Sequence, residues 1–189
     1  MSQIPVDAAN AVSVARATPD QRPLIQGLAQ LYIYDFSEME PPDATGFVFD
    51  GSGTFGPLPG MDSFWLGGDD IFPLLIRLGE RVVGFALVNT HSHLTGGAAE
   101  RNMAEFWVAR QFRRGGVATA AVHKILALYP GRWEVAVVER NSAAKAFWPR
   151  AIATAPTVSE LSRAEGDGIH WTGPVWCFRS AAKARMPVR

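Results

Sequence analysis

Two arginines and two glycines stand between an apolar segment and an amphipathic one, in the run Arg113-Arg114-Gly115-Gly116. The segment before them, Met103 to Val108, reads as a strand, and the segment after them has the three- and four-residue spacing of a helix. A strand that passes through glycines into a helix directs unpaired backbone N–H groups and the positive end of the helix dipole into one concavity. The pattern predicts an anion site, most simply for phosphates, with an ordinary strand-to-helix turn as the alternative.

Two well-known phosphate fingerprints are missing from the sequence. It has no G-x-x-x-x-G-K-[ST] motif, so a nucleoside triphosphatase P-loop is absent, and no G-x-G-x-x-G opens a first βαβ unit. A nucleotide-binding regulator that uses only the glycine turn therefore ranks last among the functional interpretations.

Candidate metal ligands are few. His91 and His93 form a His-x-His pair that could bind a metal ion, but no third ligand lies at a spacing typical of metal sites. The favoured interpretation is two solvated histidines in a loop. Cys177 is the only cysteine, which excludes an internal disulfide and a multi-cysteine zinc site and fits a reducing cytoplasm. We expect no metal in the site.

A first helix is expected after Thr18-Pro19-Asp20-Gln21, which has the composition of a capping box. The apolar residues that follow at three- and four-residue steps predict its buried face: Leu24, Leu28, Leu31 and Tyr32. Asp35 continues this stripe, so its carboxylate must be hydrogen-bonded, paired or open to a cleft. The stretch from Met39 to Asp62 is rich in glycine and proline and predicts a long loop, which we interpret as a lid on the substrate side.

The other elements follow from periodicity and turn residues. Strands are expected over residues 11–16, 71–78, 82–88, 103–108, 133–138, 157–161 and 171–179, and helices over 117–129 and after Asn141. The order of the three central strands predicts an antiparallel meander.

The central segment resembles the acetyl-CoA-dependent N-acetyltransferases of the GNAT superfamily. Arg113-x-x-Gly116-x-Ala118 matches the R/Q-x-x-G-x-G/A signature of that family, and the later Asn141-x-x-Ala144-x-x-Phe147 is similar to its second signature segment. Together with Leu31 to Ser37, the match resembles an uncharacterised bacterial branch of these proteins. The resemblance implies an α/β (α+β) fold over a single domain, residues 1–189, with a largely antiparallel twisted sheet of six to seven strands and helices on both faces.

Carried over by position, the resemblance implies a binding site for acetyl-CoA as co-substrate. The backbone amides that would hold the pyrophosphate, with help from the two arginine side chains, are those of Arg113, Arg114, Gly115, Gly116, Val117 and Ala118. Trp107 and Val108 would bind the pantetheine arm, and the Val108 amide would stabilise the oxyanion that forms on attack. Asn141 would approach the pantetheine, and Phe147 with Trp148 would pack beside the sulfur.

Direct transfer to an amine, as the family performs it, needs a base and an acid. The base candidates are Glu105 first, then Asp35, Glu134 and His91. Strand alternation sets Glu105 on the opposite face from Val108, so a structural carboxylate is the alternative for it. Where many family members carry a tyrosine that protonates the thiolate, this sequence has Trp148, whose indole cannot act as an acid. Tyr34, another residue or water would then protonate the sulfur, unless the thiolate leaves unassisted.

The composition of the chain limits the classes of binding partner that can be expected. The 189 residues include 18 basic and 18 acidic side chains, and the net charge of zero gives no reason to expect nucleic acid or an anionic membrane as a partner. No window approaches a membrane span, and we expect a cytoplasmic protein. The expected acceptor is a primary amine of a small molecule or peptide, and the apolar last strands favour a homodimer. The alternative function is a non-catalytic acyl-CoA sensor.

Overall fold

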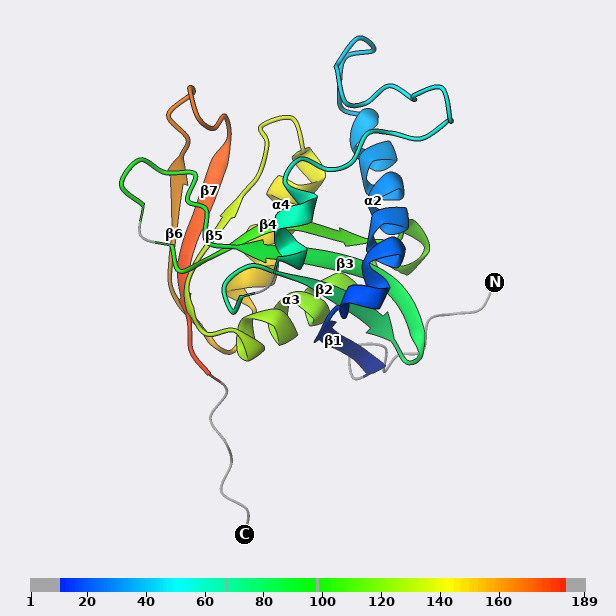
Figure 1. The fold of residues 1–189 in the computed structure, drawn as a ribbon. Coiled ribbons are helices and arrows are strands. Elements are labelled where there is room, and N and C mark those ends of the chain that lie inside the picture. The colour runs from blue at the N-terminus through cyan, green and yellow to red at the C-terminus, as the bar shows by residue number, and fades with distance from the viewer. Residues whose placement is uncertain (1–10, 67, 98, 183–189) are drawn as a thin grey trace.

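A seven-stranded sheet forms the centre of the computed structural model, which describes residues 11–66, 68–97 and 99–182 (Figure 1). In spatial order the sheet runs β1-β2-β3-β4-β5-β7-β6. The strands are β1 (Val12–Arg16), β2 (Phe72–Leu78), β3 (Arg81–Asn89), β4 (Arg101–Val108), β5 (Gly131–Ala136), β6 (Val158–Glu165) and β7 (Pro174–Ser180). All neighbours are antiparallel except β4 and β5, so the mixed, largely antiparallel sheet expected from the sequence is confirmed.

Helices cover both faces of the sheet. On one face α2 (Arg22–Ser37) and the 3₁₀ turn η2 (Met61–Trp65) pack on Phe85, Leu87 and Trp107. On the other face α3 (Val117–Leu128) and α4 (Ser142–Ala153) pack on a larger core around Trp133. Within the described residues, no helix combines the length and the hydropathy that crossing a membrane requires.

The two parallel strands separate soon after they meet. β4 and β5 pair only through Arg101 with Trp133 and Asn102 with Glu134, and beyond these residues the strands diverge toward their carboxyl ends. A bulge in β4 follows at once, because Leu87 of β3 pairs with Glu105 while Val88 pairs with Met103. The gap between the ends of β4 and β5 is therefore open to a ligand.

The first helix begins as predicted, but only two of the four residues of its predicted buried face, Leu28 and Tyr32, pack against the core. Thr18 and Gln21 form the capping box at the short turn η1 (Pro19–Gln21), directly before α2. Leu24 and Leu31 are 40% and 52% exposed, whereas the residues of α2 that are buried are Ile25, Ala29 and Ile33. The helix is rotated so that its β-branched and small residues meet the sheet, which brings Tyr32 toward the neighbouring strand β4.

The long connection after α2 is anchored at its second half. Phe55 exchanges two hydrogen bonds with the Gln30 side chain of α2, at 2.8 and 3.2 Å, and Leu58 and Met61 are buried beneath it. The segment from Pro59 through η2 lies along the α2 face of the sheet, where Pro59 and Phe64 line the cavity described below. The expected loop is confirmed, and its position beside the cavity fits the predicted substrate-side location.

Candidate active site

A cavity of about 440 Å³ lies where β4 and β5 separate. Its walls come from both faces of the sheet, with α2 and η2 on one side and the start of α4 on the other. The polar and aromatic residues of its lining include Tyr32, His91, His93, Asn102, Glu105, Asn141, Trp148 and Trp171. The opening thus passes through the sheet, so that ligands entering from opposite faces can meet inside it.

The last residues of β4 turn backbone groups into this gap. The Ala109 N–H donates to Val83 O of β3 at 2.8 Å, and since backbone groups alternate sides along a strand, Val108 directs its groups away from β3. The Val108 carbonyl already accepts a hydrogen bond from Arg113 Nε at 2.7 Å. The Val108 N–H is therefore the group that this residue can offer to a ligand in the gap.

The loop from Arg113 to Gly116 leads from the end of β4 into α3, the strand-turn-helix order that the sequence predicted. Arg114 and Gly116 have left-handed backbone conformations, with φ of 64° and 80°, which turn successive amides toward one side. The first helical hydrogen bond comes from the Ala120 N–H to Gly116 O at 2.9 Å, so the N–H groups of the preceding turn have no partner in the helix. An anion fits this position both by hydrogen bonding and by the helix dipole.

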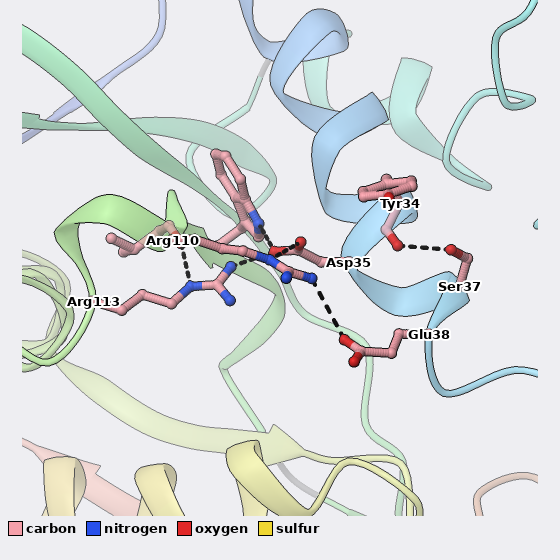
Figure 2. Close-up of polar contacts among 8 residues, drawn as sticks. Tyr34, Asp35, Ser37, Glu38, Arg110 and Arg113 are labelled. Carbon is pink, nitrogen blue, oxygen red and sulfur yellow. Dashed lines mark hydrogen bonds and ion pairs between the residues drawn. The ribbon is translucent and has the colours of Figure 1, made fainter.

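Asp35 of α2 joins the elements around this loop (Figure 2). Its carboxylate accepts from the Trp107 indole at 2.9 Å, from Arg110 Nε at 2.7 Å, and from Arg113 Nη2. Burial works against ionisation of Asp35, but the indole and the two guanidinium groups outweigh it, and the pKa of this carboxyl is lowered. A carboxylate that is ionised and already accepts three hydrogen bonds is a poor proton acceptor. Asp35 instead holds α2 against the end of β4 and the loop that follows it.

Glu105 projects into the cavity from the middle of β4. Its carboxylate accepts a hydrogen bond from the Tyr32 hydroxyl of α2. Burial raises the pKa of Glu105 to about 7, although the hydrogen bond from Tyr32 acts in the opposite direction. Burial, together with the charge of Glu105 and the hydrogen bond to it, raises the pKa of Tyr32, so the phenol stays protonated. A carboxyl group that titrates near neutral pH and faces a cavity has the properties of a general base.

The second predicted segment lies at the start of α4. Asn141 caps the helix by accepting from the Ala144 N–H at 2.9 Å, and it also lines the cavity. Trp148 is only 6% exposed, packs edge-on against Phe106 of β4, and forms part of the cavity wall. Phe147 stacks on Phe106 with ring centroids 6.1 Å apart, but it is not among the cavity-lining residues.

Three other candidates from the sequence lie in different surroundings. Tyr34 is 57% exposed and does not line the cavity, so its position does not suit the acid role considered for it from the sequence. Glu134 is buried and accepts hydrogen bonds from Ser92 Oγ at 2.8 Å and from the His93 N–H at 3.0 Å, which is a structural arrangement. His91 does line the cavity, in the loop between β3 and β4.

The sequence reasoning gave no site role to Tyr32 or Asn102, and it considered Trp171 for the acceptor pocket without assigning it. Tyr32 was placed on the buried stripe of the helix, and Trp171 was placed in the last strand, but that strand begins at Pro174. Trp171 instead lies in the loop before it and packs against the His93 ring at 4.4 Å. Within the described ranges, no three or more His, Cys, Asp or Glu side chains are arranged to hold a metal ion.

Comparisons with known proteins agree with this geometry. The family model for the acetyltransferase (GNAT) family matches residues 31–152. An acetyltransferase from Thermus thermophilus superposes with a TM-score of 0.59 at 17% identity, over 90% of this chain and 97% of that one. No curated protein sequence matches significantly.

Two further solved structures contain related ligands. The spermidine N-acetyltransferase from Vibrio cholerae, in complex with CoA and spermine, has a TM-score of 0.53 at 10% identity, over 89% of this chain and 94% of that one. The yncA protein from Salmonella typhimurium, with its cofactor acetyl-CoA, has a TM-score of 0.51 at 12% identity, over 95% and 99%. These likenesses establish the fold, and the family match extends over most of this chain. The chain therefore belongs to the acetyltransferase (GNAT) family.

Proposed function

We propose that this protein transfers an acetyl group from acetyl-CoA to a primary amine, with Glu105 as the general base. The observation that carries the proposal is the position of Glu105, which faces the cavity between β4 and β5 and whose pKa burial raises to about 7. Such a group is ionised in part at neutral pH and can take a proton from an incoming ammonium or amine. This is the residue that the sequence favoured, and the bulge before it fits its exposure to the cavity.

Of the cofactor-binding residues predicted from the sequence, Asn141 and Trp148 line the cavity, and the others lie outside its lining, at the end of β4 and the start of α3 and α4. The amides of Gly115, Gly116, Val117 and Ala118 would hold the pyrophosphate, with the exposed Arg114 beside them. Val108 would offer its N–H to the thioester carbonyl, and Trp107 contributes backbone only, because its indole is bound to Asp35. Asn141 and Trp148 would line the pantetheine arm, with Phe147 supporting them from behind.

Acetyl-CoA supplies an activated acyl group, and the chain supplies the proton transfers. Glu105 takes the proton of the amine, and the Val108 N–H stabilises negative charge on the carbonyl oxygen. Trp148 cannot act as an acid, so we assign the protonation of the leaving thiolate to the Tyr32–Glu105 pair. Once Glu105 has taken the proton of the amine, its pKa of about 7 lies below that of an ordinary thiol, so it can donate this proton to the leaving thiolate.

We assign Asp35 a positioning role. Replacing it with asparagine keeps its size but removes the charge that binds Arg110 and Arg113, and thereby loosens the hydrogen bond from Arg113 to Val108 O. Charge-assisted hydrogen bonds contribute about 1.5 to 3 kcal/mol. We expect the KM for acetyl-CoA to rise about tenfold with little change in kcat, measured by steady-state kinetics.

A matched control for Asp35→Asn is Glu38→Gln. Glu38 is 77% exposed and, among the described residues, pairs only with Arg110, at 3.5 Å, so its neutralisation should leave the KM unchanged. Tighter binding of acetyl-CoA by the Asp35 variant would contradict the assignment, because it would show that Asp35 competes with the phosphates for Arg113.

The proposed function is tested by following CoA release from acetyl-CoA with simple primary amines, beginning with n-butylamine. Calorimetric titration of acetyl-CoA into the protein should show saturable binding, and an amine should raise the rate of CoA release above hydrolysis. Binding without transfer to any amine would favour the alternative, an acyl-CoA sensor. The absence of binding at millimolar acetyl-CoA would exclude both. The cytoplasmic location and a homodimer stay predictions, as does the absence of nucleic-acid and membrane partners.

A further inference from the structure

One end of the cavity is not accounted for by acetyl-CoA. We call the four residues His91, His93, Asn102 and Trp171 the acceptor end. Trp133 and Val135, on either side of Glu134 in β5, pack against α3 and α4. Because side chains alternate along a strand, Glu134 points to the other face of the sheet, where it accepts hydrogen bonds from the loop that carries the two histidines. The acceptor end therefore lies on the α2 face of the sheet, opposite the proposed pantetheine wall at α4.

Unpaired polar atoms are concentrated at the acceptor end. Five buried side-chain polar atoms in the described part of the chain have no hydrogen-bond partner, and three of them belong to this end: His93 Nδ1, Asn102 Oδ1 and Trp171 Nε1. Buried polar groups are nearly always paired, so a cluster of unpaired ones calls for a bound group. His93 and Trp171 stand on loops, where small rotations can bring their ring nitrogens onto a ligand.

The acceptor end is electrically neutral. Burial lowers the pKa of His93 to about 4, with a further contribution from His91, so the imidazole is uncharged at neutral pH. Among the described residues that line the cavity, Glu105 carries the only carboxylate, and none is lysine or arginine. The Glu134 carboxylate lies behind His93 with both oxygens engaged, and it is not part of the cavity wall. An ammonium or carboxylate at this end would have no free counter-charge there.

We propose that the acceptor end binds an uncharged group that both donates and accepts hydrogen bonds, a carboxamide being the simplest. Its N–H would donate to Asn102 Oδ1, and its carbonyl would accept from the Trp171 indole, with the packed His91 and His93 rings as an aromatic wall. The inference rests on the proposed function and names its substrate class. The enzyme would acetylate amines that carry an amide group in preference to diamines or amino acids.

Matched amines test the proposal directly. Glycinamide, β-alaninamide and 4-aminobutanamide are compared with the corresponding amino acids and with diamines of the same length, so that only the charge of the far group changes. We expect kcat/KM to be about tenfold or more higher for at least one amide than for its charged partners, because a site with unpaired polar groups rejects ligands that leave them unpaired. Equal or higher values for the charged partners at every length would overturn the proposal.

The variant Trp171→Phe removes one unpaired donor and keeps an aromatic ring. The matched control is Trp65→Phe, which makes the same change at the other buried indole without a partner, outside the cavity lining. Trp171→Phe should lower kcat/KM for the preferred amide about tenfold, lower that for n-butylamine much less, and not lower Tm. Trp65→Phe should affect neither rate. Equal losses for both amines in Trp171→Phe would indicate a merely structural role and overturn the proposal.

Calorimetric binding of the amides to the CoA-loaded protein separates this inference from the proposed function. Amide binding that weakens in Trp171→Phe supports the acceptor end even if no acetyl transfer occurs. Transfer to n-butylamine without amide preference or amide binding leaves the proposed function intact and overturns the inference. If the protein shows neither acetyl transfer nor amide binding, both the proposed function and the inference are overturned.

Discussion

Replacing Glu105 by glutamine lowers the rate of acetyl transfer by about 100- to 10,000-fold, the contribution usual for a general base. The change keeps the shape of the side chain and its acceptor for the Tyr32 hydroxyl but removes the ionisable group. In the unmodified protein, kcat/KM should rise with pH as Glu105 loses its proton, with a midpoint near pH 7. The pH profile of the variant, measured with the same amine, should lack this step.

Tyr32→Phe serves as the graded control for the base. The phenol lowers the pKa of Glu105 against the effect of burial, so its removal should move the midpoint of the pH profile upward and reduce the rate near pH 7 less than Glu105→Gln does. A Glu105→Gln enzyme that keeps both the rate and the step near pH 7 would show that another group is the base.

The same pKa shift gives a readout that is independent of catalysis. Because the pKa of Glu105 is raised from its usual value of 4.5, the folded protein binds more protons than the unfolded chain between about pH 4.5 and 7. This contribution to the free energy of unfolding is full below pH 4.5 and is lost as the pH rises through 7. Glu105→Gln should flatten that decline, measured by denaturant unfolding at several pH values.

The parts of the site that come from one contiguous segment could be predicted from the sequence. The strand before Arg113, the glycine turn and the helix after it are local neighbours, and their periodicity and turn residues predicted the strand-turn-helix that carries the amides we assign to the pyrophosphate. Asn141 at the start of α4 is likewise a local cap, with the ordinary chemistry of an N-cap residue. Nothing distant had to be known for these assignments.

The contacts between distant segments could not be predicted. Asp35 and Arg113 are 78 positions apart, and their pairing depends on how α2 is rotated on the sheet. The predicted apolar stripe on that helix was offset from the real one, because leucines are tolerated at the surface while Ile25, Ala29 and Ile33 fit the sheet. Glu105 could be named as a candidate base, but its contact with the cavity could not be predicted, since it depends on the bulge in β4 and on the separation of β4 from β5.

Gly116→Glu weakens the binding of acetyl-CoA by about 100-fold or more, corresponding to about 2.7 kcal/mol. Gly116 has a φ of 80°, which costs an ordinary L-residue about 1 to 2 kcal/mol, and the new carboxylate would lie beside the amides that we assign to the pyrophosphate. A Cβ atom at this position meets no other atom within 4 Å, so the variant should fold. Titration calorimetry measures the change in Kd, and circular dichroism checks the fold.

Gly116→Asn separates the effect of charge from that of backbone strain. Asparagine adopts the left-handed conformation more readily than other residues and adds no charge, so this variant should lose less than about tenfold in affinity. Equal losses in the two variants would mean that the loop geometry, and not electrostatic repulsion, controls binding. A folded Gly116→Glu protein that binds acetyl-CoA as tightly as the unmodified one would place the pyrophosphate elsewhere, and the start of α3 would then be an ordinary strand-to-helix turn.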